Sequence, residues 1–489
     1  MSIPTPEPSG PRQLDSHGAS RDIDWGDFRD HLATADQKGN RRWLYPKMPE
    51  GVWHRRRAWF ATALITLMFA GPWIRIHGNP LLMINILERR FSILGQIFWP
   101  QDTLIFAVAM LVFMTGIIVF TTAFGRLWCG WACPQTVMME MVFRKVEYLL
   151  EGDAQDQRAL NAAPWTARKV FRKGLKQGVF FALSFIVGNT LLAYIIGSER
   201  LLAIQFDDPR NHVGGLTFML LFTLLFYAIF ARFREQACTF ICPYGRFQSA
   251  MLDENSMVVA YDHKRGEKRG PLHKDQPILQ RTAAGLGDCV ACRQCVTVCP
   301  TGIDIRNGTQ MECVNCTACI DACDTIMEKV GRPKGLIRFA SLNNIERGEP
   351  QRFTARMKLY ATVLSLLIAL FLFLVFTRAA TGTTLLRAPG TLFQTTAEGR
   401  IQNLYTMKVI NKTSHDLPVE LRLENHSGTV RVMGASPLVI AKESMAQTSL
   451  LIEIDPAALA GNSTSLKIGI YSDGKRLETV TTGFVGPRK

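Results

Sequence analysis

The chain has 489 residues, of which 47% are hydrophobic and only 20% charged, yet its formal net charge is +15. Apolar runs combined with strong basicity are typical of a membrane protein whose basic loops lie on one side of the bilayer. Nucleic-acid binding is excluded as the explanation, because no basic stripe is interleaved with stacking aromatic residues. The 12 cysteines fall in short clusters, and none follows Cys323. This distribution favours reduced, metal-binding thiols in the cytoplasm over a disulfide framework.

Residues 1–54 are rich in Pro, Gly, Ser, Asp and Arg. Such a segment buries too little apolar surface to fold, so we expect a disordered cytoplasmic tail. It has no early apolar stretch of the kind that marks a secretory signal.

Five apolar runs predict transmembrane helices, four of them in a membrane region over residues 55–250 and the fifth over residues 359–377. Gly71 and Pro72 interrupt the first run, so it is the weakest of the five. The five runs are Ala58–Ile76, Thr103–Phe124, Gly178–Gly197, Gly214–Phe233 and Leu359–Phe376. Lys and Arg are concentrated before the first run and after the second and fourth. This bias places the N-terminus inside and the C-terminus outside.

Two C-x3-C-P motifs follow the second and fourth runs, as in a duplicated helix pair. Their thiols are Cys129 and Cys133 in the first motif and Cys238 and Cys242 in the second. Four thiols on one side of the membrane could converge, and soft thiolates select Cu(I), zinc or an iron–sulfur centre. A redox-active disulfide, a third cluster and simple packing of buried cysteines are the alternatives. Met138, Met139 and Met141 would either add thioether ligands or fill gaps between helices.

A polar, basic linker over residues 251–285 leads to a predicted ferredoxin unit at 286–331, and a second linker covers 332–358. The unit repeats the pattern C-x2-C-x2-C-x3-C, which in bacterial ferredoxins binds two [4Fe–4S] clusters with crossed ligation. Each fourth cysteine is expected to start a helix that carries it toward the other cluster. The first cluster would take Cys289, Cys292, Cys295 and Cys323, and the second Cys313, Cys316, Cys319 and Cys299. Zinc knuckles are disfavoured, since zinc needs no third cysteine in one short loop.

Residues 378–489 change character and predict a periplasmic, all-β immunoglobulin-like sandwich. Short strand-like runs recur from Leu404 to Tyr471, and Ser472-Asp473-Gly474 is a hairpin signal. No catalytic constellation is visible there. The predicted fold class is therefore a membrane α-helical protein with a two-cluster ferredoxin-like α+β insert and a C-terminal β-sandwich.

The combination of five spans, two C-x3-C-P motifs, the double ferredoxin motif and a β-rich C-terminal domain resembles the CcoG family, also called FixG or RdxA. The resemblance implies an inner-membrane accessory protein for a bacterial cbb-type cytochrome c oxidase. It also implies reduction of Cu(II) to Cu(I) on the cytoplasmic side, with Cys129, Cys133, Cys238 and Cys242 as copper-handling or electron-exit thiols. The implied partners are the copper ion, oxidase assembly factors or a copper transporter, and an unidentified electron donor. A homodimer is left open.

Two other functions stay open at this stage. One is a quinol-linked electron-transfer subunit, and the other is a non-enzymatic assembly scaffold or redox sensor. A transporter and a hydride-transferring enzyme are disfavoured, because no G-x-x-x-x-G-K-[ST] loop and no G-x-G-x-x-G after a strand is present.

Overall fold

The computed structural model divides the chain into two compact units. Unit 1 comprises residues 1–71, 110–193 and 198–367, and unit 2 comprises residues 72–109, 194–197 and 368–489. The described residues are 13–14, 20–21, 34, 40–76, 78–85, 90–93, 95–99, 102–272, 281, 283–350, 353–390, 392–413, 415–434, 438–442, 444–459 and 461–487. The predicted tail therefore lies mostly outside the described residues, apart from a pair of two-residue strands, β1 (Gln13–Leu14) and β2 (Ser20–Arg21), and the stretch from Asn40.

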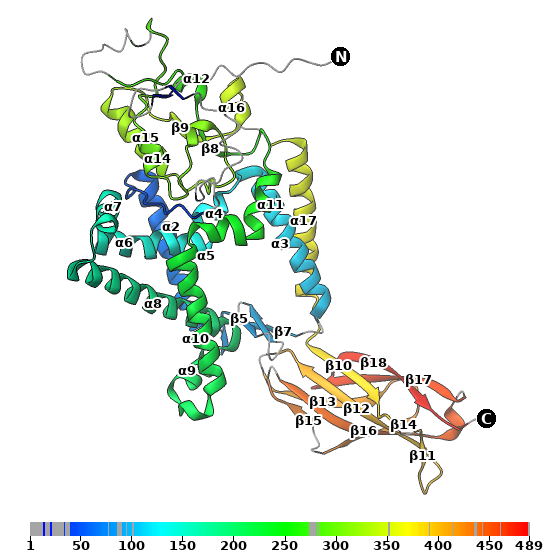
Figure 1. The fold of residues 1–489 in the computed structure, drawn as a ribbon. Helices are drawn as coiled ribbons and strands as arrows, with labels where there is room; N and C mark the ends of the chain where they lie inside the picture. The colour runs from blue at the N-terminus through cyan, green and yellow to red at the C-terminus, as the bar shows by residue number, and fades with distance from the viewer. Residues whose placement is uncertain are drawn as a thin grey trace, which may run out of the picture. The chain divides into compact units, whose positions relative to one another are not determined.

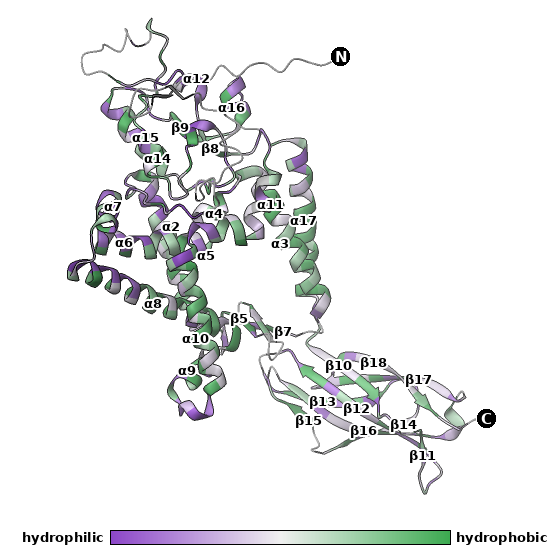
Figure 2. Cartoon of the chain, in the orientation of Figure 1, coloured by the Kyte–Doolittle hydropathy of each residue, from purple (hydrophilic) through white to green (hydrophobic). Residues whose placement is uncertain are grey.

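Four long apolar helices are able to cross a membrane by length and composition. They are α3 (Thr103–Phe124), α8 (Ala167–Ile196), α10 (Val213–Ala228) with the π-helical turn Ile229–Phe233, and α17 (Ala355–Phe376) (Figure 1). Figure 2 shows that α3, α10 and α17 are hydrophobic over most of their length. The second predicted span has the observed bounds. The third begins earlier than predicted, because a basic stretch precedes the apolar part of α8.

The first predicted span is shorter than expected. α2 covers Val52–Ala70 and ends at Gly71, and strand β3 (Arg75–Ile76) occupies the predicted end of the run. Pro72 lacks the N–H that a continuing helix needs, which ends α2 early. Three arginines in its first turns, Arg55–Arg57, set α2 apart from the four apolar helices.

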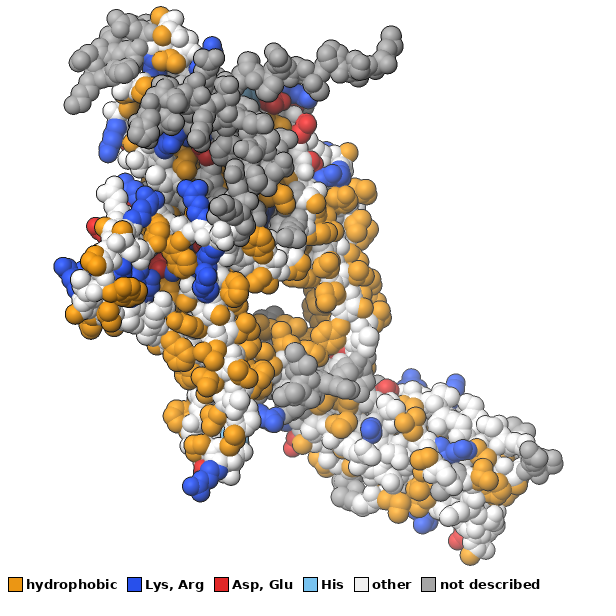
Figure 3. Space-filling model, in the orientation of Figure 1, with side chains coloured by type: hydrophobic (Ala, Val, Ile, Leu, Met, Phe, Trp, Pro, Cys, Tyr) orange, Lys and Arg blue, Asp and Glu red, His pale blue; other side chains and the backbone are white. Residues whose placement is uncertain are grey.

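Short helices follow α3 and α10 on the same side of unit 1. After α3 come α4 (Leu127–Trp131), α5 (Pro134–Met138), the π-helical turn Met139–Phe143, α6 (Arg144–Glu151) and α7 (Ala154–Ala162). Helix α9 (Ser198–Phe206) and a 3-10 turn (Pro209–Asn211) connect α8 to α10, and the π-helical turn Ala237–Ile241 and α11 (Pro243–Met251) follow α10. Lys and Arg side chains gather over α6, α7 and the start of α8 (Figure 3).

Buried ion pairs tie these segments together. Glu147 accepts hydrogen bonds from Arg234, and Lys176 lies 2.9 Å from Glu151 and 3.4 Å from Glu147. Arg144, on the same face of α6, pairs with Glu140 at 3.1 Å. Removing one partner of such a pair leaves an uncompensated buried charge, so the network fixes the position of α6 against α8 and Arg234.

The ferredoxin unit is framed by an antiparallel strand pair that the sequence did not predict. β8 (Val258–Tyr261) and β9 (Ile337–Ala340) lie in the two predicted linkers and pair along their full length. Between or beside them are α12 (His263–Gly266), α14 (Gln294–Thr297), a 3-10 turn (Ile305–Asn307), α15 (Ala318–Lys329) and α16 (Leu342–Arg347). Apolar side chains of β8, β9, α14, α15 and the 3-10 turn form one core with the cluster-motif cysteines. The folded unit thus extends beyond residues 286–331.

Unit 2 is a β-sandwich with two small hairpin sheets. The strands are β10 (Thr381–Arg387), β11 (Gln394–Thr395), β12 (Ile401–Asn411), β13 (Leu417–Leu423), β14 (Gly428–Met433), β15 (Leu438–Ile440), β16 (Met445–Ile454), β17 (Ser463–Ser472) and β18 (Lys475–Val485), with a 3-10 turn at Pro456–Ala458. One sheet has the order β10-β12-β16-β14, with β11 beside β12, and the other has the order β15-β13-β17-β18. The predicted hairpin turn joins β17 to β18, where Asp473 and Gly474 have φ of 49° and 76°.

Residues between α2 and α3 also belong to unit 2. β3 pairs with β4 (Asn79–Pro80), and β5 (Leu82–Asn85), β6 (Arg90–Ile93) and β7 (Gln96–Phe98) form a three-stranded sheet. Asp102, at the start of α3, joins this segment to the sandwich: it lies 2.7 Å from Arg378 and 2.6 Å from Lys412. The predicted architecture, helical membrane region, ferredoxin unit and C-terminal sandwich, is confirmed.

Candidate functional site: two cysteine pockets and a thiol quartet

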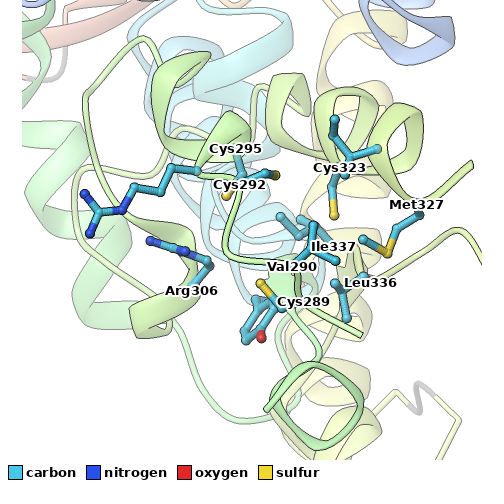
Figure 4. Close-up of a pocket in the computed structure, with 12 residues that line it drawn as sticks. Cys289, Val290, Cys292, Cys295, Arg306, Cys323, Met327, Leu336 and Ile337 are labelled. Atoms are coloured by element: carbon cyan, nitrogen blue, oxygen red, sulfur yellow. The ribbon is translucent and has the colours of Figure 1, made fainter. Parts of the chain in front are cut away.

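The eight cysteines of the ferredoxin motif line two neighbouring pockets. Four of them line the first pocket: Cys289, Cys292, Cys295 and Cys323. Figure 4 shows these side chains around one space, with Cys323 reaching in from α15 and the others from the loop and from α14. The second pocket is lined by Cys295, Cys299, Cys313, Cys316 and Cys319. Apart from Cys295, which lines both pockets, each pocket combines cysteines of one motif copy with the last cysteine of the other.

The expectation that each fourth cysteine starts a helix is wrong. Cys299 follows the one-turn helix α14, and Cys323 lies in the middle of α15. α15 instead begins beside Thr317, so its first turns carry Cys319 and its next turn Cys323. Residues four apart on a helix share a face, and this spacing lets one helix contribute to both pockets.

Both loops bend in the same unusual way. Ala291 and Arg293 flank Cys292 with φ of 52° and 57°, and Asn315 and Thr317 flank Cys316 with φ of 54° and 67°. Non-glycine residues seldom adopt this left-handed conformation, and strained backbone of this kind clusters at ligand sites. Since the two copies share it at equivalent positions, the loops are shaped alike around their thiols.

Burial disfavours the ionised form of the cysteine thiols that line these pockets. It raises the pKa of Cys295 and of Cys313 to about 12 in each case, although Arg306 opposes the shift at Cys295. Arg306 lines the first pocket and is held by Asp304 at 2.5 Å. Binding iron would displace these protons, because only the thiolate is a ligand.

The donor set fits iron–sulfur cubes. A [4Fe–4S] cluster needs four thiolates, and the eight cysteines that line the two pockets provide four for each. In the described part of the chain, no three His, Cys, Asp or Glu side chains converge closely enough to hold a metal ion. Thiols spaced around a common space suit a cube better than the tight tetrahedron of a single zinc ion.

The two C-x3-C-P motifs have matching local structures. Cys133 and Cys242 are extended residues that precede a helix, and Pro134 and Pro243 occupy its first turn. Proline is favoured there because its missing N–H would be unpaired in any case. Cys129 lies in α4 and Cys238 in a π-helical turn, so the first thiol of each motif lies in a helical turn and the second lies just before the next helix.

The four thiols of these motifs, hereafter the thiol quartet, lie near enough to influence one another's pKa, although no three of them are close enough in this structure to hold one metal ion. Burial raises the pKa of Cys129 to about 11, and the charges of Cys133 and Cys242 add to the rise. Burial likewise raises the pKa of Cys238 to about 12, with contributions from the same neighbours and from Cys129. The Cys129 thiol donates a hydrogen bond of 2.9 Å to Gln248 Oε1 on α11, which ties the first motif to the second.

The quartet lies directly beside the second cysteine pocket. A small pocket at Cys238 is also lined by Pro300 and Val314, the neighbours of Cys299 and Cys313. Gly130 packs so closely that a Cβ there would collide with the Val314 carbonyl oxygen. Trp131 Nε1 donates to the Asn315 carbonyl at 3.3 Å, and Arg126 Nη1 donates to the Met311 carbonyl. The charge of buried Arg126 lowers the pKa of both Cys129 and Cys313, against the larger effect of burial.

The three methionines after the first motif pack into apolar clusters. Met138, Met139 and Met141 are buried among residues such as Phe143 and Phe180. This environment fits the interpretation that the three methionines fill gaps between helices. Met139 also lines the pocket at Cys238.

Known protein families match three parts of the chain. A model of the 4Fe-4S dicluster domain matches residues 233–342, a 4Fe-4S binding domain matches residues 106–151, and the IG-like fold at the C-terminus of FixG matches residues 371–487. Protein RdxA of Cereibacter sphaeroides is 34% identical over 405 residues, which cover 79% of this chain and 83% of RdxA. The chain belongs to the FixG/RdxA family.

Two further relatives support the assignment of the chain to the FixG/RdxA family. Protein RdxB of Cereibacter sphaeroides is 32% identical over 86% of this chain and 90% of RdxB. Nitrogen fixation protein FixG of Rhizobium meliloti is 37% identical over 62% of this chain and 58% of FixG. This FixG/RdxA protein is thus a FixG-like, multi-pass membrane iron–sulfur oxidoreductase.

The match over residues 106–151 bears on the thiol quartet of this FixG/RdxA protein. It covers Cys129 and Cys133 and is described as a 4Fe-4S binding domain. Two cysteines are too few for such a cluster, and Cys238 and Cys242 are the nearby thiols that would complete a set of four.

Sequence reasoning missed three residues that organise the site. Arg126 lies between the quartet and the second pocket, Gln248 joins the two motifs, and Asp321 caps α2 from α15. Arg126 lies three residues before Cys129 and Gln248 lies six residues after Cys242, and this closeness in sequence is the only feature that could have indicated their role. Nothing in the sequence pattern pointed to Asp321.

Proposed function

We propose that this protein reduces Cu(II) to Cu(I) on the cytoplasmic side of a bacterial inner membrane, for assembly of a cbb-type cytochrome c oxidase. The observation that carries the proposal is the contact between the thiol quartet and the second cysteine pocket through Val314 and Pro300. A soft, sulfur-only site suits Cu(I). Its position beside the pocket of Cys299 and Cys313 suits delivery of single electrons.

The ligands that we propose for the two clusters follow the pocket linings. Cys289, Cys292, Cys295 and Cys323 would hold one, and Cys299, Cys313, Cys316 and Cys319 the other. When bound, the clusters supply one-electron transfer. The chain itself shields part of the site: Cys129 is buried and Cys238 is half-buried, and the charge of Arg126 acts on both Cys129 and Cys313. Cu(II) would displace thiol protons on binding, and a thiolate set would favour the reduced ion.

The orientation rests on basic residues near the helix ends. Lys and Arg concentrate on the segments that hold the quartet, from Arg126 to Lys176 and from Arg232 to Arg234. By the positive-inside rule these segments and the ferredoxin unit face the cytoplasm, and the sandwich faces the periplasm. We propose that oxidase assembly factors or a copper transporter accept the Cu(I). That the protein forms a homodimer is a separate part of the proposal.

A second candidate is favoured by the family match over residues 106–151. In it, the quartet holds a third [4Fe–4S] cluster, and copper is reduced elsewhere or another acceptor is used. The two candidates differ in iron content: about eight iron atoms per chain for two cubes and about twelve for three.

The test is an anaerobic Cu(II) reduction assay on detergent-purified, dithionite-reduced protein. We compare the parent with a variant in which Cys129, Cys133, Cys238 and Cys242 are all changed to Ser, and we measure iron in both. The proposal expects about eight iron atoms in each protein and much slower reduction by the variant. Equal rates with equal iron would refute the quartet as the copper site. A loss of about four iron atoms in the variant would establish the third cluster instead.

A further inference from the structure

A large apolar cavity lies beside the thiol quartet and is not used by the function proposed above. Its volume is about 740 Å³, within the range of small-molecule sites. The C-terminal half of α3, from Phe113 to Phe120, forms one wall. Trp128 and the start of α11, with Tyr244 and Phe247, form the other.

The cavity and the quartet share their backbone. Trp128 directly precedes Cys129, and Pro243 and Tyr244 directly follow Cys242. A molecule in the cavity would therefore lie against residues bonded to both motifs. This placement is suited to electron exchange between the bound molecule and the quartet.

A short polar chain leads from the cavity to a thiol. Tyr244 lies next to Thr121 and Gln248, and the Gln248 side-chain amide donates a hydrogen bond of 3.3 Å to the Thr121 hydroxyl. Gln248 Oε1 in turn accepts the bond from the Cys129 thiol. Tyr244 is thus the polar group of an otherwise apolar lining, and it is linked to the redox site.

The cavity is reachable from lipid. Phe113 on the membrane helix α3 is 63% exposed and Trp128 is 45% exposed. A water-soluble donor would gain little by binding to so apolar a surface. A molecule dissolved in the bilayer would reach this surface directly.

We propose that this cavity binds the aromatic head group of a lipid-soluble quinol, which is the electron donor of the protein. The assignment rests on the proposed function for its acceptor, since one quinol reduces two Cu(II) ions: QH2 + 2 Cu(II) gives Q + 2 Cu(I) + 2 H⁺. The phenolic ring stacks against Phe120 and Trp128, and a ring hydroxyl bonds Tyr244. An acyl chain of a phospholipid is the competing occupant, but it would use neither the hydroxyl nor the link to Cys129.

Binding is tested first, without turnover. Decylubiquinone is titrated into the detergent-purified, full-length protein, and quenching of tryptophan fluorescence is followed. We expect saturable quenching. We expect Tyr244→Phe to weaken binding roughly five- to tenfold, the effect of one lost hydrogen bond. Ile117→Trp, which fills the cavity, abolishes binding.

Matched controls separate these effects from general damage. Tyr227→Phe removes a tyrosine hydroxyl that bonds Gln177 outside the cavity. Leu111→Trp adds the same bulk on an exposed part of α3. Both controls should bind like the parent. Non-saturable quenching, equal affinity in Tyr244→Phe, or retained binding in Ile117→Trp would overturn the proposal. Co-purified phospholipid that falls only in Ile117→Trp, with quinone binding absent from the parent, would assign the cavity to an acyl chain.

Two assays keep this inference distinct from the copper proposal. Decylubiquinol oxidation with ferricyanide as acceptor measures the quinol step without copper, and it should be slow in Tyr244→Phe. Cu(II) reduction by dithionite-reduced protein measures the copper step without quinol, and it should be normal in Tyr244→Phe. If the quinol assay fails while the dithionite assay succeeds, the donor assignment is wrong and the copper proposal stands. The reverse pattern leaves quinol as donor and rejects copper as acceptor.

Discussion

At the scale of single residues, Arg126 is the side chain that most directly joins the two parts of the site. It is buried, it donates to the Met311 carbonyl, and its charge acts on both Cys129 and Cys313. A positive charge between two sets of thiolates stabilises their ionised forms. The quartet and the second cysteine pocket are therefore electrostatically coupled through one guanidinium.

Arg126→Gln should slow Cu(II) reduction by roughly ten- to a hundredfold, the usual cost of losing a group that supports metal ligands. Arg126→Lys should be intermediate, because it keeps the charge but not the forked geometry. Arg55→Gln, on an exposed position of α2, is the control for net charge. The measurement is the dithionite-driven rate, with iron content as a check on folding. A lysine variant as slow as the glutamine variant would mean that geometry, not charge, matters.

In unit 2, the buried charged residue that joins separate segments is Asp102. Its carboxylate lies between Arg378 and Lys412, and all three side chains are largely buried. Asp102→Asn would leave two buried cations without their counter-ion, a change that typically costs about 3–5 kcal/mol. We expect a lower unfolding temperature for the sandwich, with the thiol quartet and its chemistry unchanged. An unaltered thermal transition would show that the carboxylate is dispensable.

The same residue predicts a pH dependence. Burial would raise the pKa of Asp102, but the hydrogen bond from Lys412 and the charge of Arg378 hold it below its ordinary value of 3.8. A carboxyl group with a lowered pKa adds stability that is present above its unfolded pKa and is lost as the pH falls through its folded pKa. Acid should therefore destabilise unit 2 below about pH 3.8 in the parent and much less in Asp102→Asn, as followed by circular dichroism of the sandwich.

At the scale of elements, α2 is anchored to the ferredoxin unit by a cap from another helix. The Asp321 carboxylate on α15 accepts hydrogen bonds from the Trp53 and His54 amides, at 3.1 and 2.7 Å. Gly51 precedes them with φ of 146°, and a Cβ there would collide with Asp321. The carboxylate thus satisfies free N–H groups at the start of α2 and favours its dipole.

Asp321→Ala should cost about 0.5–2 kcal/mol, the range for a lost helix cap. The loss of this cap should speed hydrogen exchange of the backbone amides in the first turn of α2 and leave exchange in the other helices unchanged. Ser341→Ala is the matched control, since Ser341 caps the separate helix α16 through the Asn344 amide. Gly51→Ala should be more damaging, because it adds both a collision and backbone strain. Exchange that stays slow at Trp53 in Asp321→Ala would contradict the cap.

Local patterns account for what the sequence predicted. Four apolar runs became helices, the paired cysteine spacing indicated two pockets, and an Asp-Gly pair marked the hairpin between β17 and β18. The missed elements depend on contacts between distant residues. β8 and β9 pair across some 80 positions, and β3–β7 are too short for a reliable alternation. The convergence of Cys129 with Cys238 and the role of Arg126 also arise only when separate segments pack.

At the scale of the whole molecule, the chain passes between the two units five times. The passages fall after Gly71, Ala109, Ala193, Gly197 and Leu367. The first follows α2, the second lies in α3, the third and fourth lie at the C-terminal end of α8, and the last lies in α17, whereas α10 lies wholly in unit 1. Four helices, α3, α8, α10 and α17, are long and apolar enough to cross a membrane, and α2 does not match them in composition.

We expect α2 to cross the membrane as the fifth span, because an apolar run makes up its residues from Ala58 to Ala70. Its apolar part, Ala58–Ala70, is about 20 Å long at 1.5 Å per residue, which is short for a hydrocarbon core of about 30 Å. Long arginine side chains that extend to the interface compensate for such a mismatch, and the exposed Arg55 and Arg56 lie at the N-terminal end of this apolar part. Reporter fusions decide the matter: alkaline phosphatase, active only in the periplasm, and a fluorescent protein, active only in the cytoplasm, are joined after Gly78, Glu151 and Val485. Five crossings give phosphatase activity after Gly78 and Val485 and fluorescence after Glu151. If α2 does not cross, the fusion after Gly78 reports the same side as the N-terminus, and the sandwich then shares that side as well.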